Sequence, residues 1–168
     1  KISKLLDSVK ELDIVIPEFQ REYVWSKEQA KELMVSLFQE YPTGSILVWE
    51  TNNPPEIKNN AVGRERMGWI KVLLDGQQRL TTLYLLIKGE IPPYYKESDI
   101  SHDPRDLYFN LKTGEFNYYQ KQKMENSPFW KSVIDCFNDK LDAFTLIKDL
   151  HLEDAQEELQ IGRTVNEN

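Results

Sequence analysis

Cysteine and histidine are scarce in this chain, which limits the kinds of site that it can hold. The 168 residues include one cysteine, Cys136, and two histidines, His102 and His151. One cysteine cannot form an internal disulfide, which suits a reducing compartment. Structural zinc sites consist mainly of cysteine and histidine ligands, so we expect none here.

A long apolar run and an excess of basic residues are also missing. No stretch is long or apolar enough to cross a membrane, so we expect a cytoplasmic protein with no membrane partner. The net charge is −7, whereas domains that bind duplex DNA by themselves usually carry a basic excess. We therefore expect any DNA to bind mainly through another domain or subunit. The candidates for a local contact are Lys58, Arg64, Arg66 and Lys71, for which a solvated loop is the alternative.

The most informative stretch is a polar cluster between an expected strand and an expected helix. The apolar run 69–74 predicts a largely buried strand, and apolar residues at helical spacing over 80–87 predict a helix that ends at Gly89. Between them lie Asp75, Gly76, Gln77, Gln78 and Arg79. A strand that leads through a glycine turn into a helix leaves backbone N–H groups available for a phosphate.

Helix capping is the alternative interpretation of part of this cluster. Asp75 is the expected N-cap residue, and Gln78 would complete a capping box. Capping does not explain Gln77 or Arg79, because an arginine in the first turn of a helix opposes the helix dipole. A bound phosphate would offset that cost, and an internal carboxylate is the competing explanation.

A second polar and aromatic cluster lies upstream. The apolar run 14–16 predicts a short strand, and Ser26 is expected to cap the helix that follows the cluster. Tyr23 and Trp25 fit core packing better than ligand contacts. Arg21 is different, because arginine is seldom buried unpaired and its guanidinium suits a phosphate.

Three separated motifs carry a resemblance to a known family. They are Ile16-Pro17-Glu18-Phe19-Gln20-Arg21-Glu22-Tyr23-Val24-Trp25, Tyr41-Pro42-Thr43-Gly44-Ser45-Ile46 and Asp75-Gly76-Gln77-Gln78-Arg79-Leu80-Thr81-Thr82-Leu83, in that order. Over residues 1–120 the chain resembles the amino-terminal domain of GmrSD-type restriction enzymes, a ParB/sulfiredoxin-like domain.

The resemblance implies a domain that binds and hydrolyses a nucleoside triphosphate, GTP or ATP, together with Mg²⁺. In that family the domain serves the restriction of phage DNA, including modified DNA, in combination with a nuclease domain or subunit. Carried over to this sequence, the run 75–79 would form the nucleotide site. Gln20 and Arg21 would approach it from the neighbouring strand end.

The residue types suggest how such a site would work. Arg21 and Arg79 can clamp phosphate oxygens, and Gly76 lets the backbone approach them closely. Asp75 can hold Mg²⁺ or act as a base. No Gly-x-x-x-x-Gly-Lys-Ser/Thr loop is present, so an ordinary P-loop is excluded.

Four further side chains are candidates for this site. Gln77 or Gln78 can orient the attacking water. Thr81 and Thr82 can supply a hydroxyl to the metal and nucleotide, although a threonine inside a helix is usually structural.

Other functions stay open at this point. A metal-dependent nuclease could use Asp75 and Arg79 for DNA cleavage. A nucleotide sensor or protein-interaction module without catalysis is the third hypothesis. The sequence also leaves homo-oligomerisation open.

We expect an α+β fold, with a small mixed sheet and helices in a nucleotide-binding domain at 1–120. Residues 45–49 predict a second buried strand. The polar stretch 51–68 predicts a loop, which either closes over the nucleotide or is a passive hairpin connection. The run 107–118 predicts a hairpin.

The rest of the chain, 121–168, is expected to be the start of a helical subdomain. One helix is predicted from Ser127 and Pro128, and a last one over 142–159. Together with the chain ends, this predicts a fragment of a longer protein.

Overall fold

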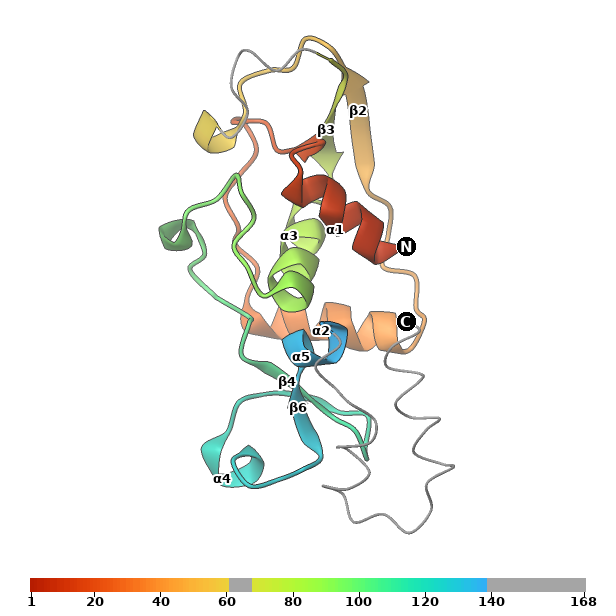
Figure 1. The fold of residues 1–168 in the computed structure, drawn as a ribbon, viewed down its shortest axis with the longest axis vertical. Coiled ribbons are helices and arrows are strands. Elements are labelled where there is room, and N and C mark those ends of the chain that lie inside the picture. Colours follow the sequence, from red (N-terminus) through yellow and green to blue (C-terminus); the bar gives the residue numbers. More distant parts are fainter. Residues whose placement is uncertain (61–67, 139–168) are drawn as a thin grey trace.

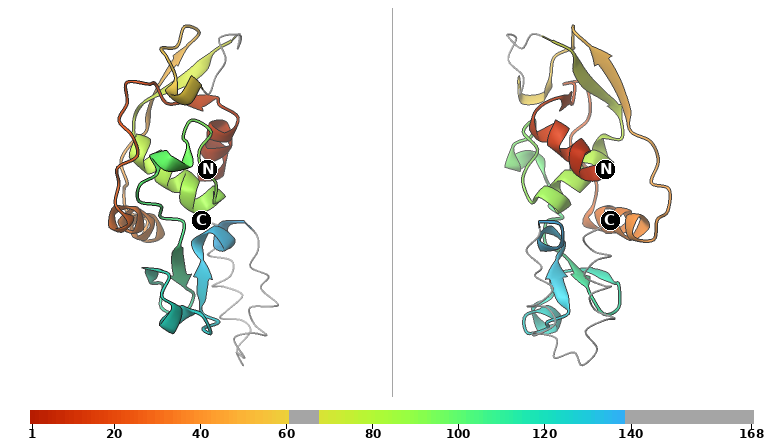
Figure 2. Two further views of the ribbon diagram at one scale, coloured as in Figure 1. Left: turned by 90° about the vertical axis from the view of Figure 1, so that its left-hand side faces the viewer. Right: turned by 45° about the vertical axis from the view of Figure 1, so that its right-hand side comes forward.

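Two small sheets with helices between them make up residues 1–60 and 68–138, the part of the chain that the computed structural model describes (Figure 1). Both views of Figure 2 keep the sheets at opposite ends of the long axis. The helical elements are α1 (Ile2–Lys10), α2 (Lys27–Phe38), η1 (Lys58–Asn60), α3 (Gln77–Leu83), η2 (Tyr84–Lys88), η3 (Glu97–Asp99), α4 (Lys121–Met124) and α5 (Val133–Phe137). The strands are β1 (Ile14–Val15), β2 (Leu47–Thr51), β3 (Ile70–Asp75), β4 (Leu107–Asn110), β5 (Phe116–Tyr118) and β6 (Trp130–Ser132). The expected α+β class is confirmed.

In the first sheet, two of the three sequence motifs meet at the end of the sheet where β1 and β3 finish. Its strand order is β1-β3-β2, with β3 in the centre, parallel to β1 and antiparallel to β2. Because parallel strands end at the same edge, the chain leaves β1 towards Gln20 beside the point where β3 ends at Asp75. Gln20 and Arg21 therefore lie beside the end of β3, while their roles in nucleotide binding stay predictions.

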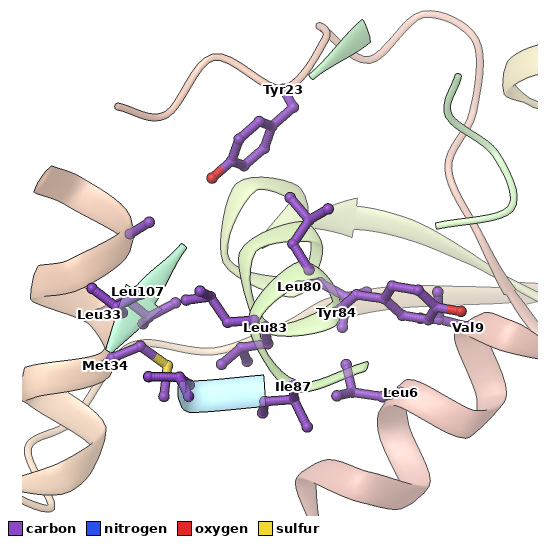
Figure 3. Packing of buried hydrophobic residues seen from close by; sticks show 14 of the residues in the cluster. Leu6, Val9, Tyr23, Leu33, Met34, Leu80, Leu83, Tyr84, Ile87 and Leu107 are labelled. Carbon is purple, nitrogen blue, oxygen red and sulfur yellow. The ribbon is translucent and has the colours of Figure 1, made fainter. Parts of the chain in front are cut away.

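The helix after β3 forms the centre of the hydrophobic core. α3 continues directly into the π-helical turn η2 and ends at Gly89, as expected. Leu80, Leu83 and Tyr84 on this helix are buried. Figure 3 shows them between side chains from α1 on one side and α2 on the other. The core thus fixes the helix whose first turn carries the polar cluster.

α2 begins as its sequence predicts. The Ser26 side chain accepts a hydrogen bond from the Gln29 backbone N–H, and the Gln29 side chain accepts one from the Ser26 backbone N–H. This reciprocal pair is a capping box. α2 buries Ala30, Leu33 and Met34.

In the second sheet the predicted hairpin is confirmed, whereas the helix predicted from Ser127 and Pro128 is partly wrong. β4 and β5 form the predicted hairpin. β6, however, occupies 130–132, where we expected a helix, and the helix α5 begins only at Val133. The free edge of β4 provides backbone partners for these residues, which local periodicity does not reveal. Since β6 pairs with β4, this sheet contains residues from both sides of the expected boundary at 120.

β2 is a strand, but the prediction that it is buried is wrong. Leu47, Val48 and Trp49 are all exposed. β2 lies at the edge of its sheet, and the order β1-β3-β2 leaves one side of it without a strand partner among the described residues. An apolar run identifies a strand but not its place in the sheet.

The stretch 51–68 leaves β2 at the end of the sheet opposite to the polar cluster. Thr51 pairs with Ile70, whereas Leu47 pairs with Asp75. The described part of this stretch packs against the segment after β1, where Ile57 forms a bridge with Pro17 and the Lys58 N–H donates to the Ile16 carbonyl. It is therefore more than a passive hairpin connection, and closure over the nucleotide stays a prediction. Lys58 lies within it, and its side chain is only 4% exposed and paired with Glu22. Lys58 is therefore not an exposed DNA contact.

Some predictions lie outside the described residues. These are Arg64 and Arg66 in the basic cluster and the last helix at 142–159. Within the described ranges, no helix has the length and apolar character that a membrane crossing needs.

Candidate functional site

A polar pocket of about 210 Å³ lies where β1 and β3 end and α3 begins. Its lining residues come from two of the three sequence motifs: Gln20, Arg21, Trp25, Asp75, Gly76, Gln77, Gln78 and Arg79. The structure therefore brings together most of the predicted site residues. Trp25 lines the pocket and also packs against the hydrophobic core, which was the favoured interpretation of its sequence context.

The turn between β3 and α3 differs from the capping interpretation. Gly76 is the N-cap residue, with φ of +91°, and α3 has no side-chain cap. Asp75 remains the last residue of β3, so it cannot occupy the N-cap position, and the predicted capping box with Gln78 does not form. The left-handed conformation at Gly76 explains this, because glycine adopts it readily and turns the chain sharply. A Cβ atom at Gly76 would also lie only 3.1 Å from Ile46 Cγ1.

Gln78 is bound to the backbone of the upstream motif. Its Oε1 accepts hydrogen bonds from the Val24 N–H at 2.9 Å and the Trp25 N–H at 3.3 Å. Its Nε2 donates to the Glu22 carbonyl at 2.9 Å. One side chain thus satisfies three backbone groups that belong to no strand ladder.

Gln77 and Gln20 make two more connections of the same kind. Gln77 Nε2 donates to the Arg21 carbonyl and to the Tyr95 hydroxyl. Gln20 Nε2 donates to the carbonyls of Leu73 and Leu74 near the end of β3, at 3.1 and 2.9 Å. The segment that follows β1 is therefore bound to both β3 and α3.

Tyr95 contacts the site through its hydroxyl, which accepts a hydrogen bond from Gln77. Its ring is buried, and burial raises the pKa of its hydroxyl to about 12. The phenol therefore stays neutral at neutral pH. Its position depends on a chain reversal after α3 and η2 that no local pattern encodes.

Arg79 binds the middle motif. Its guanidinium donates to the carbonyls of Thr43 and Ser45, and it lies 3.4 Å from Asp75 Oδ2. These internal acceptors offset the unfavourable position of a cation in the first turn of a helix. Gly44 lies between the two carbonyls with φ of +87°, and a Cβ atom there would lie 2.3 Å from Arg79 Nη1.

Among the charged residues that line the pocket, Arg21 and Asp75 are open to solvent. Arg21 is exposed, and its guanidinium has no hydrogen bond or ion pair within residues 1–60 and 68–138. The Asp75 side chain is 73% exposed, and its contact with Arg79 is long. These two side chains are therefore available to a ligand without breaking a strong internal contact.

Thr81 and Thr82 lie elsewhere. Both are fully buried, and the Thr82 hydroxyl is 3.0 Å from the Tyr23 hydroxyl. Neither lines the pocket. Their predicted roles in nucleotide binding stay predictions, and Thr82 has a visible packing role.

No group of three or more metal-ligating side chains occurs in the described part of the chain, so a metal here would need ligands from a substrate or water.

Comparison with known proteins gives the family. Residues 2–167 match the model of the "GmrSD restriction endonuclease, N-terminal domain". The chain is also 37% identical over 98 residues to the "Uncharacterized protein MJ0686" of Methanocaldococcus jannaschii. That alignment covers 49% of this chain and 16% of the archaeal protein, so the matched region is a small part of a longer relative. The chain belongs to the family of GmrSD restriction endonuclease N-terminal domains.

Proposed function

We propose that this domain binds a nucleoside triphosphate with Mg²⁺ in the pocket between β3 and α3, hydrolyses it, and thereby regulates a nuclease that restricts phage DNA. The observation that carries the proposal is Arg21, an exposed arginine at the wall of a polar pocket whose guanidinium has no partner among the described residues. A guanidinium in this position suits phosphate oxygens, which it can bind through two parallel hydrogen bonds.

The backbone around Gly76 supports the same ligand. The first turn of a helix has N–H groups without intrahelical acceptors, and α3 has no side-chain cap to satisfy them. Gly76 has no side chain, so a phosphate can approach the turn closely. Arg79 adds positive charge to the wall while its hydrogen bonds keep it in place.

Asp75 is the carboxylate placed to hold Mg²⁺. Its side chain is largely exposed at the pocket, next to the turn where the phosphates would lie. Mg²⁺ is commonly held by one or two carboxylates together with substrate phosphates and water. In hydrolysis the metal would neutralise charge that develops on the phosphate oxygens. Asp75 would therefore matter more for turnover than for binding.

Nuclease regulation is the part of the proposal that rests on the family. The matching family consists of domains of restriction endonucleases, so a larger protein with a nuclease part is implied. The net charge of −7 argues against DNA binding by this chain alone. We propose that a nuclease domain or subunit binds the DNA and that the nucleotide state of this domain controls it.

Calorimetric titration with GTP and with ATP, each with Mg²⁺, tests the binding step. We expect saturable binding of at least one nucleotide and a loss of affinity of about tenfold or more in Arg21→Ala, because a charge-assisted contact contributes roughly 1.5–3 kcal/mol. Lys123→Ala is the matched control, since it removes one positive charge from the exposed part of α4. The absence of binding to the folded wild-type chain would contradict the proposal.

Phosphate release tests the hydrolysis step. We expect Asp75→Asn to retain nucleotide affinity within a few-fold and to lose turnover. Mg²⁺-dependent cleavage of DNA by the wild-type chain without any nucleotide would contradict this assignment. It would instead favour a nuclease that uses the same Asp75.

A further inference from the structure

We infer that Gln77 and Gln78 are positioning residues, which hold the segment 21–25 so that Arg21 and Trp25 face the pocket, and that Gln78 does not orient the attacking water. The identity of the ligand in this inference rests on the proposed function. The contacts themselves do not depend on it, because all of them join parts of this chain.

The polar atoms of Gln78 are almost fully used. A primary amide offers two lone pairs on oxygen and two N–H donors. The oxygen accepts from Val24 and Trp25, and one N–H donates to Glu22. Gln78 is 6% exposed, so little of it can reach a water in the pocket.

Gln77 is occupied at its amide nitrogen, whereas its Oε1 has no hydrogen-bond partner among the described residues. Its Nε2 contacts both the Arg21 carbonyl and the Tyr95 hydroxyl, and the residue is 5% exposed. Its two N–H donors therefore have partners within the protein. A water bound by Nε2 would have to displace one of them.

The segment 21–25 has few other backbone contacts. It lies between β1 and α2, and only Tyr23 takes part in a β-bridge, with Ile100. The glutamine contacts lie on both sides of that bridge along the segment, at Arg21, Glu22, Val24 and Trp25. Together with the buried Tyr23 ring and the Glu22–Lys58 ion pair, they hold this wall of the pocket in place.

The pocket residues thus fall into two groups, those whose side chains face the pocket and those that hold the backbone of the first group. Arg21 and Trp25 present their side chains to the pocket, while their backbone groups are held by Gln77 and Gln78. Trp25 is the one large apolar side chain among the pocket-lining residues, and its indole can contact the ring of a nucleobase. Loss of the glutamine contacts would displace the cation and the ring together.

Two substitutions at Gln78 and one control test the inference. Gln78→Met keeps the approximate size of the side chain and removes all three hydrogen bonds. Gln78→Glu keeps the acceptor for Val24 and Trp25 and loses the donor to Glu22. Gln122→Glu is the control, because it makes the same chemical change at an exposed position on α4.

Hydrogen–deuterium exchange without ligand gives the direct readout. In Gln78→Met we expect the amides of Val24 and Trp25 to exchange at least about tenfold faster, while the amides of β3 keep their protection. Equal acceleration throughout the core would indicate a general loss of stability and would overturn the inference. Because no nucleotide is present, this measurement decides the positioning role even if the proposed function fails.

Titration with GTP and ATP in the presence of Mg²⁺ gives the second readout. We expect Gln78→Met to weaken binding by about 10- to 100-fold, the usual cost of losing a supporting contact. Binding by Gln78→Glu should recover as the pH falls towards 5, because a protonated carboxyl can donate to the Glu22 carbonyl again. Gln122→Glu should show no such pH dependence relative to wild type. Loss of turnover with unchanged affinity and unchanged exchange at Val24 and Trp25 would overturn the inference, since it would indicate a direct role in the reaction.

Discussion

Gly44 and Arg79 depend on each other at the wall of the pocket. Arg79 reaches the carbonyls on both sides of Gly44, and this close approach is possible because Gly44 has no side chain. The φ of +87° at Gly44 also favours glycine. The motif 41–46 therefore carries its glycine for two reasons, one of conformation and one of space.

Gly44→Ala should consequently destabilise the protein by about 1–3 kcal/mol, because the new Cβ clashes with Arg79 and the backbone conformation is unfavourable. Urea unfolding measures this loss. Gly68→Ala is the control, since Gly68 also has positive φ, at +131°, but no atom lies within 4 Å of its ideal Cβ. Equal losses in the two variants would show that the contact with Arg79 adds nothing.

Residue roles at the site were only partly predictable from the sequence. The run 75–79 and Arg21 were expected to share a site, and they line one pocket. The backbone partners of Gln77, Gln78 and Arg79 were not predictable, because they are carbonyl and N–H groups of segments more than thirty residues away. No residue type marks such a partner in a sequence, since every residue has a backbone.

Among the elements, α2 has the best-defined beginning. Its capping box supplies acceptors for two backbone N–H groups. α2 also follows directly after the wall segment that ends at Trp25, so its first turn anchors that segment on one side.

Ser26→Ala should lower the free energy of unfolding by about 1 kcal/mol, because one N-terminal amide of α2 loses its partner. Thermal unfolding should show a fall in Tm of about 2–4 °C. Ser36→Ala makes the same substitution inside α2, where no cap is involved, and should leave Tm nearly unchanged. A similar fall in both variants would contradict the assignment of the effect to capping.

Whether a segment is a helix or a strand was easier to predict than its burial and its neighbours in the sheet. Helical spacing and strand-like runs indicated α2, β3, the helix after Gly76 and the hairpin of β4 and β5. The exposure of β2 and the strand β6 could not be predicted in this way. Both depend on whether another strand lies alongside, which is a question of pairing across the chain.

At the scale of the whole molecule, buried tyrosines give the protein a distinct alkaline behaviour. Burial raises the pKa of Tyr84 and of Tyr95 to about 12, from the ordinary value of 10.0. Burial also raises the pKa of Tyr23. The folded state therefore holds these phenol protons more tightly than the unfolded state does.

The free energy of unfolding should be unaffected by these groups below pH 10 and should fall as the pH rises from 10 towards 12. Below the pKa of the unfolded state the phenols are neutral in both states, and above it only the unfolded state ionises freely. Absorbance at the phenolate band should accordingly show a class of tyrosines that titrates late in the folded protein and at the ordinary pKa in urea. A single transition at the ordinary pKa in the folded protein would contradict this prediction.

The amino-acid sequence by itself determined the family, the α+β class and the place of the polar cluster at the junction of β3 and α3. These features follow from periodicity, from turn residues and from motifs of adjacent residues, all of which are local. The tertiary structure alone decided that Gln77, Gln78 and Arg79 bind the backbone of the two upstream motifs and that Arg21 and Asp75 remain open. The reason is physical: whether a polar side chain faces a ligand or the protein depends on which backbone groups lack partners nearby, and only the folded chain brings those groups together.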